Sequence, residues 1–296
     1  MKEIMLKAYA KINLGLDVVG KRQDGYHDVR MIMQTIRLYD KLRMKRIAKD
    51  EILIKTNLSY LPTNDNNLVY RAVQMLKEEF QIEQGIYVDL EKHIPVAAGL
   101  AGGSTDAAAT LIGMNKLFDL RLSKKELMDR AVKLGADIPY CIMRGTALSE
   151  GIGEILTPLP SMPEAYVIIA KPAINVSTKY VYENLKLDLN TIHPDIDGMI
   201  DAINTSNLRG VTDRLDNVLE SVTVEKYPII QEIKQTLKDY GAMNAIMSGS
   251  GPTVFGIFDN LNQAKKAFRY LKIEGKAKQI FLTDFYNRRR GKKSDE

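Results

Sequence analysis

The stretch with the clearest chemical potential is residues 95–110, PVAAGLAGGSTDAAAT, where glycines and alanines surround two adjacent hydroxyl residues. A glycine-rich loop that opens a helix commonly binds an anion, because the helix start presents unpaired N–H groups and a partial positive charge. The same composition would also allow a helix to pack tightly against a strand, and the loop alone leaves that alternative open. The predicted phosphate cradle contains Gly99, Gly102, Gly103, Ser104 and Thr105.

Two familiar nucleotide motifs do not fit this loop. No lysine follows the glycines as a P-loop requires, and the run lacks the GxGxxG spacing with an acidic partner about 20 residues further on. The protein-kinase signatures HRD and DFG are absent as well. A ligand bound here would therefore use another scaffold.

The elements around the loop are predicted from their apolar spacing. Residues 85–95 alternate apolar and polar side chains, which indicates a strand running directly into the loop. Helical spacing follows over 104–118, and it also occurs over 66–80 after asparagine caps. Residues 122–135 begin with Ser123 and Glu126 at capping-box spacing, which predicts a further helix. The opening residues 4–20 read as one strand or two short ones.

Three prolines within residues 158–163 indicate a domain boundary. Beyond it the pattern is typical of a small antiparallel sheet covered by helices. We therefore expect an α+β chain of two domains, 1–160 and 161–287, followed by a basic tail, 288–296, which we expect to be disordered. The predicted elements are strands at 165–172 and 277–285, two strands within 244–258 around a glycine turn, and helices at 197–208, 226–240 and 260–272.

Composition excludes several classes of protein. With 296 residues, 45% hydrophobic and 27% charged, the chain is typical of a globular protein rather than a disordered one. No apolar run approaches the ~18 residues needed to span a bilayer, and we expect a cytoplasmic protein that does not bind membranes. The single cysteine, Cys141, excludes an internal disulfide and is expected to be a buried small hydrophobe. Three scattered histidines suggest no zinc cluster.

The net charge is +5. The tail, with five basic and two acidic residues, contributes +3 of it, so the rest of the chain carries only +2. Specific binding of nucleic acid by the tail is therefore a minor alternative. We expect a monomer or a weak homodimer.

Three motifs in order resemble those of the GHMP kinases, named for galactose, homoserine, mevalonate and phosphomevalonate kinases. They are KAYAKINLGLDV at residues 7–18, PVAAGLAGGSTDAA at 95–108 and MSGSGPTVFGIF at 247–258. The resemblance implies an N-terminal α/β domain, a C-terminal ferredoxin-like domain and an active site in the cleft between them. It implies that ATP phosphates bind to Pro95, Val96, Ala97, Ala98, Gly99, Leu100, Ala101, Gly102, Gly103, Ser104 and Thr105.

Mg²⁺ must accompany ATP. No carboxylate cage is apparent, so we expect phosphates and water to hold the ion, with Ser104 or Thr105 as a candidate source of one oxygen.

The resemblance narrows to the branch whose acceptor is a cytidine diphosphate derivative of a sugar alcohol. This branch is marked by DGYH at residues 24–27 and by the block from GADIP to EGIGE at 135–154. A GHMP kinase acting on another small alcohol is the alternative.

In the reaction that this resemblance implies, Asp137 is the catalytic base. Lys11 would lie beside it and keep it ionised, and Asn13 would help to hold the substrate polyol. Without the resemblance, Asp137 reads as a turn residue and Lys11 as one of many solvated lysines.

Cytidine recognition is implied for Tyr26 and His27, because a base is commonly held by aromatic stacking and by hydrogen bonds to its edge. Thr178 and Tyr182 would complete this substrate site, with Tyr180 as the alternative stacking residue. The turn at residues 249–251 would approach the site through its backbone.

Overall fold

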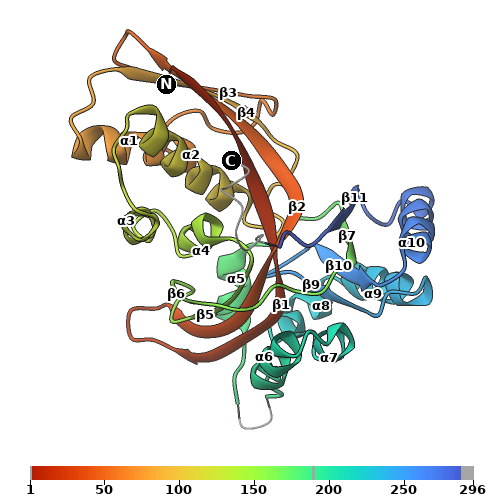
Figure 1. Cartoon of the computed structure of the whole chain (residues 1–296). Helices are drawn as coiled ribbons and strands as arrows, with labels where there is room; N and C mark the ends of the chain where they lie inside the picture. Colours follow the sequence, from red (N-terminus) through yellow and green to blue (C-terminus); the bar gives the residue numbers. More distant parts are fainter. Residues whose placement is uncertain (1, 189–190, 288–296) are drawn as a thin grey trace.

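The computed structural model describes residues 2–188 and 191–287, and the predicted basic tail, 288–296, lies outside this described part. The described elements form two β-sheets with helices on their outer faces, as Figure 1 shows. The predicted α+β architecture is therefore confirmed.

The first sheet has seven strands in the order β3-β4-β2-β1-β8, with β5 paired to β2 and β6 paired to β5. Its centre is the long antiparallel pair β1 and β2, so the opening of the chain forms one strand rather than two. The strands are β1 (Glu3–Lys21), β2 (His27–Ile47), β3 (Ile52–Thr56), β4 (Gly85–Glu91), β5 (Thr146–Glu150), β6 (Ile155–Pro158) and β8 (Asp216–Asn217).

Four helices cover one face of this sheet (Figure 1). The predicted caps are present: the Asn67 side chain accepts from Val69 N, and Ser123 and Glu126 form the capping box. The helix predicted over 122–135 ends earlier, and a short helix that the sequence analysis did not predict follows it. The helices are α1 (Leu68–Glu79), α2 (Gly102–Leu117), α3 (Lys124–Ala131) and α4 (Ile138–Met143).

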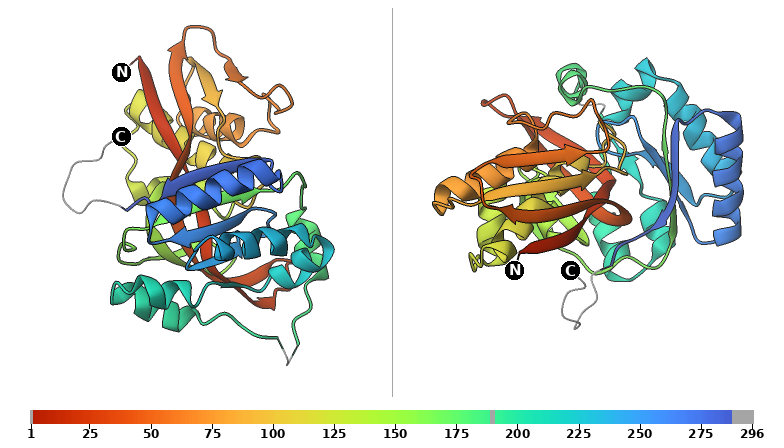
Figure 2. Two further views of the ribbon diagram at one scale, coloured as in Figure 1. Left: turned by 90° about the vertical axis from the view of Figure 1, so that its right-hand side faces the viewer. Right: turned by 90° about the horizontal axis from the view of Figure 1, so that it is seen from above.

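The second sheet has the order β11-β7-β10-β9 and is antiparallel throughout. Figure 2 shows α9 and α10 on its outer face. The elements of this half are β7 (Tyr166–Lys171), α5 (Thr178–Asn184), α6 (Ile196–Asn204), α7 (Leu208–Thr212), α8 (Glu220–Lys226), α9 (Ile229–Asp239), β9 (Asn244–Met247), β10 (Val254–Phe258), α10 (Leu261–Glu274) and β11 (Gln279–Asp284).

An apolar cluster packs between the two sheets. Ala10, Ile12 and Leu14 of β1 belong to a buried cluster with Val167 of β7 and Phe255 of β10. Successive side chains of a strand point to opposite faces, so the residues between these three point toward the helices instead. The alternation along β1 therefore separates a packing face from a face available for chemistry.

The chain also crosses back between its halves, because β8 pairs in parallel with β1 through Gly15 and Leu16. Strand pairing alone therefore does not divide the chain at one point. The domain limits 1–160 and 161–287 stay a prediction.

Candidate active site

A cleft of about 510 Å³ opens between the first sheet, the start of α2 and segments from the second half of the chain. Of the residues that the sequence analysis selected, the structure brings together along this cleft Lys11, Asn13, Pro95, Val96, Ala97, Ala98, Gly99, Ala101, Gly102, Gly103, Ser104, Asp137, Thr178 and Tyr182.

The backbone of the glycine loop, residues 95–101, has an alternating conformation. Ala97, Gly99 and Ala101 have φ angles of 50°, 72° and 55°, in the left-handed region. Alternation of this kind turns successive N–H groups toward a common concavity that suits an anion. The loop thus has the geometry of a phosphate cradle, which a merely packed strand–helix junction would not need.

Helix α2 begins directly after this loop, and its N-cap residue Ala101 provides no side-chain cap. The first turn therefore directs its N–H groups and its positive dipole end at the cleft. Two of the predicted cradle residues, Leu100 and Thr105, are not among the residues that line the cleft. Leu100 is buried, and Thr105 uses both its donors inside the protein: its hydroxyl bonds Tyr9 O at 2.8 Å and its N–H bonds Ala101 O.

Lys11, Asn13 and Asp137 lie close together beneath the loop. Lys11 Nζ donates a hydrogen bond to Asn13 Oδ1 at 2.8 Å and lies 3.6 Å from Asp137 Oδ2. The Lys11 side chain is 7% exposed, whereas that of Asp137 is 33% exposed. The aspartate therefore presents an accessible carboxylate to the cleft, next to a shielded positive charge.

Irregular backbone pairing and a short helix position the side chains of Lys11, Asn13 and Asp137. The register between β1 and β2 shifts on both sides of Lys11 and Asn13, as is common where a strand must aim side chains at a site. Asp137 is the N-cap of α4, and the buried Tyr140 hydroxyl of that helix donates to Gly145 O at 2.7 Å and lies 3.0 Å from Thr35 Oγ1. Both the lysine and the aspartate are thus held by rigid elements.

A second glycine turn supports the loop from the other half of the chain. Ser248 Oγ donates to Gly99 O at 2.9 Å. A Cβ added to Gly99 would lie 2.1 Å from Ser248 O, so this contact requires glycine. The predicted backbone approach of the turn at 249–251 is therefore a tight contact, and Gly249 and Ser250 line the cleft.

The predicted cytidine site gathers only part of its residues. His27 and Tyr182 face each other with ring centroids 5.1 Å apart, while Tyr26 is 61% exposed beside them in sequence. Tyr180 packs under Lys226 and does not line the cleft, so Tyr182 has the better position. Thr178 Oγ1 lies 2.8 Å from Ser250 Oγ.

The surroundings of His27 and Tyr182 favour the uncharged form of both rings. Burial, with a smaller contribution from Lys21, lowers the pKa of His27. Burial, together with the charge of Asp137, raises the pKa of Tyr182 to about 12. An uncharged imidazole can both donate and accept hydrogen bonds, as the edge of a base requires.

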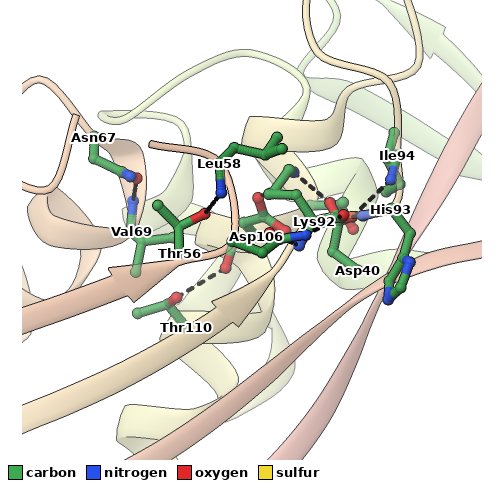
Figure 3. Close-up of polar contacts among 12 residues, drawn as sticks. Asp40, Thr56, Leu58, Asn67, Val69, Lys92, His93, Ile94, Asp106 and Thr110 are labelled. Carbon is green, nitrogen blue, oxygen red and sulfur yellow. Dashed lines mark hydrogen bonds and ion pairs between the residues drawn. The ribbon is translucent and has the colours of Figure 1, made fainter. Parts of the chain in front are cut away.

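A buried ionic group that no motif in the sequence predicted lies beside the cleft, as Figure 3 shows: Asp40 of β2, Lys92 after β4 and Asp106 of α2. The sequence contains one indication of this group: Lys92 is a charged residue placed between an alternating strand and a glycine loop. Other lining residues that were not selected include Leu61, Pro62, Asn67 and Leu68.

Two features are absent from the described residues. No group of three or more His, Cys, Asp or Glu side chains there is arranged to hold a metal ion. Within residues 2–188 and 191–287, no helix combines the length and apolar character that crossing a bilayer demands. Cys141 is free and buried, as predicted.

Known proteins match the chain along most of its length. Residues 67–145 match the family model described as GHMP kinases N terminal domain, and residues 188–277 match GHMP kinases C terminal. A protein of Lachnoclostridium phytofermentans named 4-diphosphocytidyl-2-C-methyl-D-erythritol kinase is 60% identical over 286 residues, which cover 97% of this chain and 98% of that protein. The chain belongs to the GHMP kinase family.

The chain is therefore a kinase, and other relatives carry the same name as the Lachnoclostridium protein. The protein of Lachnospira eligens is 55% identical over 97% of this chain and 99% of its own. A crystal structure of 4-(cytidine 5'-diphospho)-2C-methyl-D-erythritol kinase matches with a TM-score of 0.82 at 28% identity, covering 95% of this chain and 99% of that one. A homoserine kinase of Cytophaga hutchinsonii matches with a TM-score of 0.78 at 20% identity, covering 96% and 94%, which supports the fold alone.

Proposed function

We propose that this GHMP kinase transfers the γ-phosphoryl group of ATP to the 2-hydroxyl of 4-diphosphocytidyl-2-C-methyl-D-erythritol, giving the 2-phosphate and ADP. The step belongs to non-mevalonate synthesis of isoprenoid precursors. The observation that carries the proposal is the Lys11–Asp137 pair, 3.6 Å apart in a cleft bordered by an anion-binding loop. The names of the full-length relatives support the acceptor.

The transfer is direct, without a phosphoenzyme. Asp137 accepts the proton of the substrate hydroxyl while the hydroxyl oxygen bonds to the γ-phosphorus and the bond to the bridging oxygen of ADP breaks. Lys11, fixed by Asn13, lies next to the reacting oxygen and offsets negative charge there. The loop N–H groups and the start of α2 hold the remaining phosphate oxygens.

Mg²⁺ supplies charge neutralisation on the phosphates when it is bound with ATP. Ser104 lines the cleft at the start of α2. Its hydroxyl is the side-chain oxygen that would lie near the ion. Phosphate oxygens and water would supply the other ligands, in keeping with the lack of a group of three or more His, Cys, Asp or Glu side chains placed for a metal ion among the described residues.

The cytosine would lie among Tyr26, His27 and Tyr182, whose rings can stack on its faces and bond its edge. Asn13 and Thr178 would contact the polyol side of the substrate. Tyr26 would have to move toward the base, which its exposure permits.

Measurement of ADP release tests the proposal directly. The cytidyl substrate, mevalonate and homoserine are each supplied with ATP and Mg²⁺. We expect turnover with the cytidyl substrate alone; turnover with mevalonate or homoserine and none with the cytidyl substrate would overturn the acceptor assignment.

A further inference from the structure

The glycine loop has a conformation that its own residues do not favour. Ala97 and Ala101 both have positive φ angles, and a non-glycine residue in this region costs about 1–3 kcal/mol. Such residues persist only where the surrounding structure fixes them. The anchors at the two ends of the loop therefore decide whether its N–H groups stay aimed at the cleft.

The chain before the loop is anchored by Asp40 of β2. One oxygen of this carboxylate accepts from two consecutive backbone groups, His93 N at 2.5 Å and Ile94 N at 2.7 Å. The Asn57 side chain meanwhile bonds both the N–H and the C=O of Lys92. The three residues that lead into the loop thus have almost no freedom.

The chain after the loop is tied to the same anchor. Lys92 Nζ contacts the second oxygen of Asp40 and donates to Asp106 Oδ2 of α2 at 2.6 Å (Figure 3). The side chains of all three residues are at most 4% exposed. A single buried ammonium group therefore joins the residue before the loop to the helix after it.

We propose that the Asp40–Lys92–Asp106 cluster positions the phosphate-binding loop, so that nucleotide affinity depends on residues that need not contact the phosphates. The cluster joins the segments on either side of the loop, whereas the contacts from Lys11 N to Leu100 O and from Ser248 to Gly99 support its second half. This inference rests on the proposed nucleotide site but not on the identity of the acceptor alcohol.

Asp40 allows a clean test because it does not line the cleft, unlike Lys92 and Asp106. The variant Asp40→Asn keeps the side-chain volume but presents an amide to Lys92 or to the backbone donors. We expect the dissociation constant and the KM for ATP to rise ~10-fold or more, since small misplacements of a binding group have large effects. We expect kcat at saturating ATP to change less than ~3-fold and the KM for the acceptor to be unchanged within ~2-fold.

Lys77→Met is the matched control. Lys77 is a largely buried lysine of helix α1 that pairs with Asp50 and donates to two backbone carbonyls, and it does not line the cleft. This variant should lose stability as Asp40→Asn does, but it should keep the wild-type affinity for ATP.

Calorimetric titration with ATP separates the possible failures. If wild-type protein binds ATP and Asp40→Asn binds it equally well, the positioning role is wrong even when the variant melts at a lower temperature. If Asp40→Asn does not fold, Asp40→Glu, which keeps the charge and moves it by one methylene, must show the same selective loss. Wild-type binding of ATP without turnover of any alcohol would overturn the proposed function and leave the positioning role standing.

Discussion

The Lys11–Asp137 pair and the Asp40–Lys92–Asp106 cluster lie beside the same loop and consist of the same residue types, yet they are built differently. Lys11 is 3.6 Å from a carboxylate that is one-third exposed, and its hydrogen bond goes to Asn13. Lys92 bonds its carboxylates directly, and each of the three side chains is at most 4% exposed.

The difference follows from what each group must do. A carboxylate that accepts a proton from a substrate needs an oxygen that no other donor occupies, and such a site must be open to the cleft. A carboxylate that fixes the backbone is better saturated with donors and shielded from water, because its bonds are then stronger. The loose pair therefore fits catalysis and the tight cluster fits positioning.

The largest effect should come from removing the open carboxylate. We expect Asp137→Ala to lower kcat at least ~100-fold, the lower range for loss of acid–base assistance, while binding of ATP is retained. Single-turnover kinetics and ATP titration measure the two properties. The matched control is Asp129→Ala, which removes an exposed aspartate of α3 paired with Lys125. Near-normal turnover of Asp137→Ala would remove it from the role of base.

A second, smaller effect distinguishes the proposed cytidine site from the proposed nucleotide site. We expect Tyr26→Ala to raise the KM for the cytidyl substrate by ~5-fold or more, because stacking on a base contributes about 1–3 kcal/mol. The KM for ATP should stay unchanged. Steady-state kinetics with each substrate varied in turn measures both constants, and the reverse pattern would assign the tyrosine to the nucleotide instead. Tyr60→Ala, at another exposed tyrosine, is the control.

The tight cluster predicts an effect of pH on stability. Burial raises the pKa of Asp106 well above its usual range; the charge of Lys92 opposes this shift and the charge of Asp40 adds to it. Asp106 Oδ1 is buried and has no hydrogen-bond partner among the described residues. Asp106 therefore binds a proton more tightly in the folded state than in the unfolded chain, where its ordinary pKa is about 3.8, so the contribution of this group to wild-type stability falls as pH rises above that value toward the folded-state pKa.

Asp106→Asn removes this linkage. We expect its free energy of unfolding to fall less steeply with pH than that of the wild type, by up to ~1.4 kcal/mol per pH unit. Urea unfolding between about pH 5 and 7 measures the slopes. Parallel curves for the two proteins would mean that Asp106 is ionised in the fold.

The smallest effect concerns Cys141, four residues beyond Asp137 on the same helix but turned away from solvent. Burial raises the pKa of this thiol. We expect a disulfide reagent to leave the native protein unmodified near pH 8 and to modify one thiol per chain after unfolding in urea. Rapid reaction of the native protein would show that α4 opens, and with it the support of Asp137.

The sequence predicted most elements because their signals are local. Alternation marked β4, and side-chain caps marked α1 and α3. Helix α4 was overlooked because its six residues are apolar on every side and give no periodicity. Strand β8 was overlooked because it has two residues and exists only through its pairing with β1.

The residues of the candidate site also divide into those that local motifs predicted and those that only the fold brings together. Motifs selected Lys11 and Asp137 from positions 126 residues apart, and their proximity then followed in the structure. Lys92 was passed over because its significance lies in two aspartates that the fold brings to it. Thr105 was selected as a neighbour of Ser104, although one further helical step turns its hydroxyl inward.

The contact between Gly99 and Ser248 has a consequence for how this enzyme can be divided or recombined. The proposed nucleotide cradle is supported by a turn that is synthesised some 150 residues later, so neither half made alone would contain this contact. Exchange of one half with that of a distant relative would have to preserve the close approach of the Gly99 backbone to both the carbonyl and the hydroxyl of Ser248.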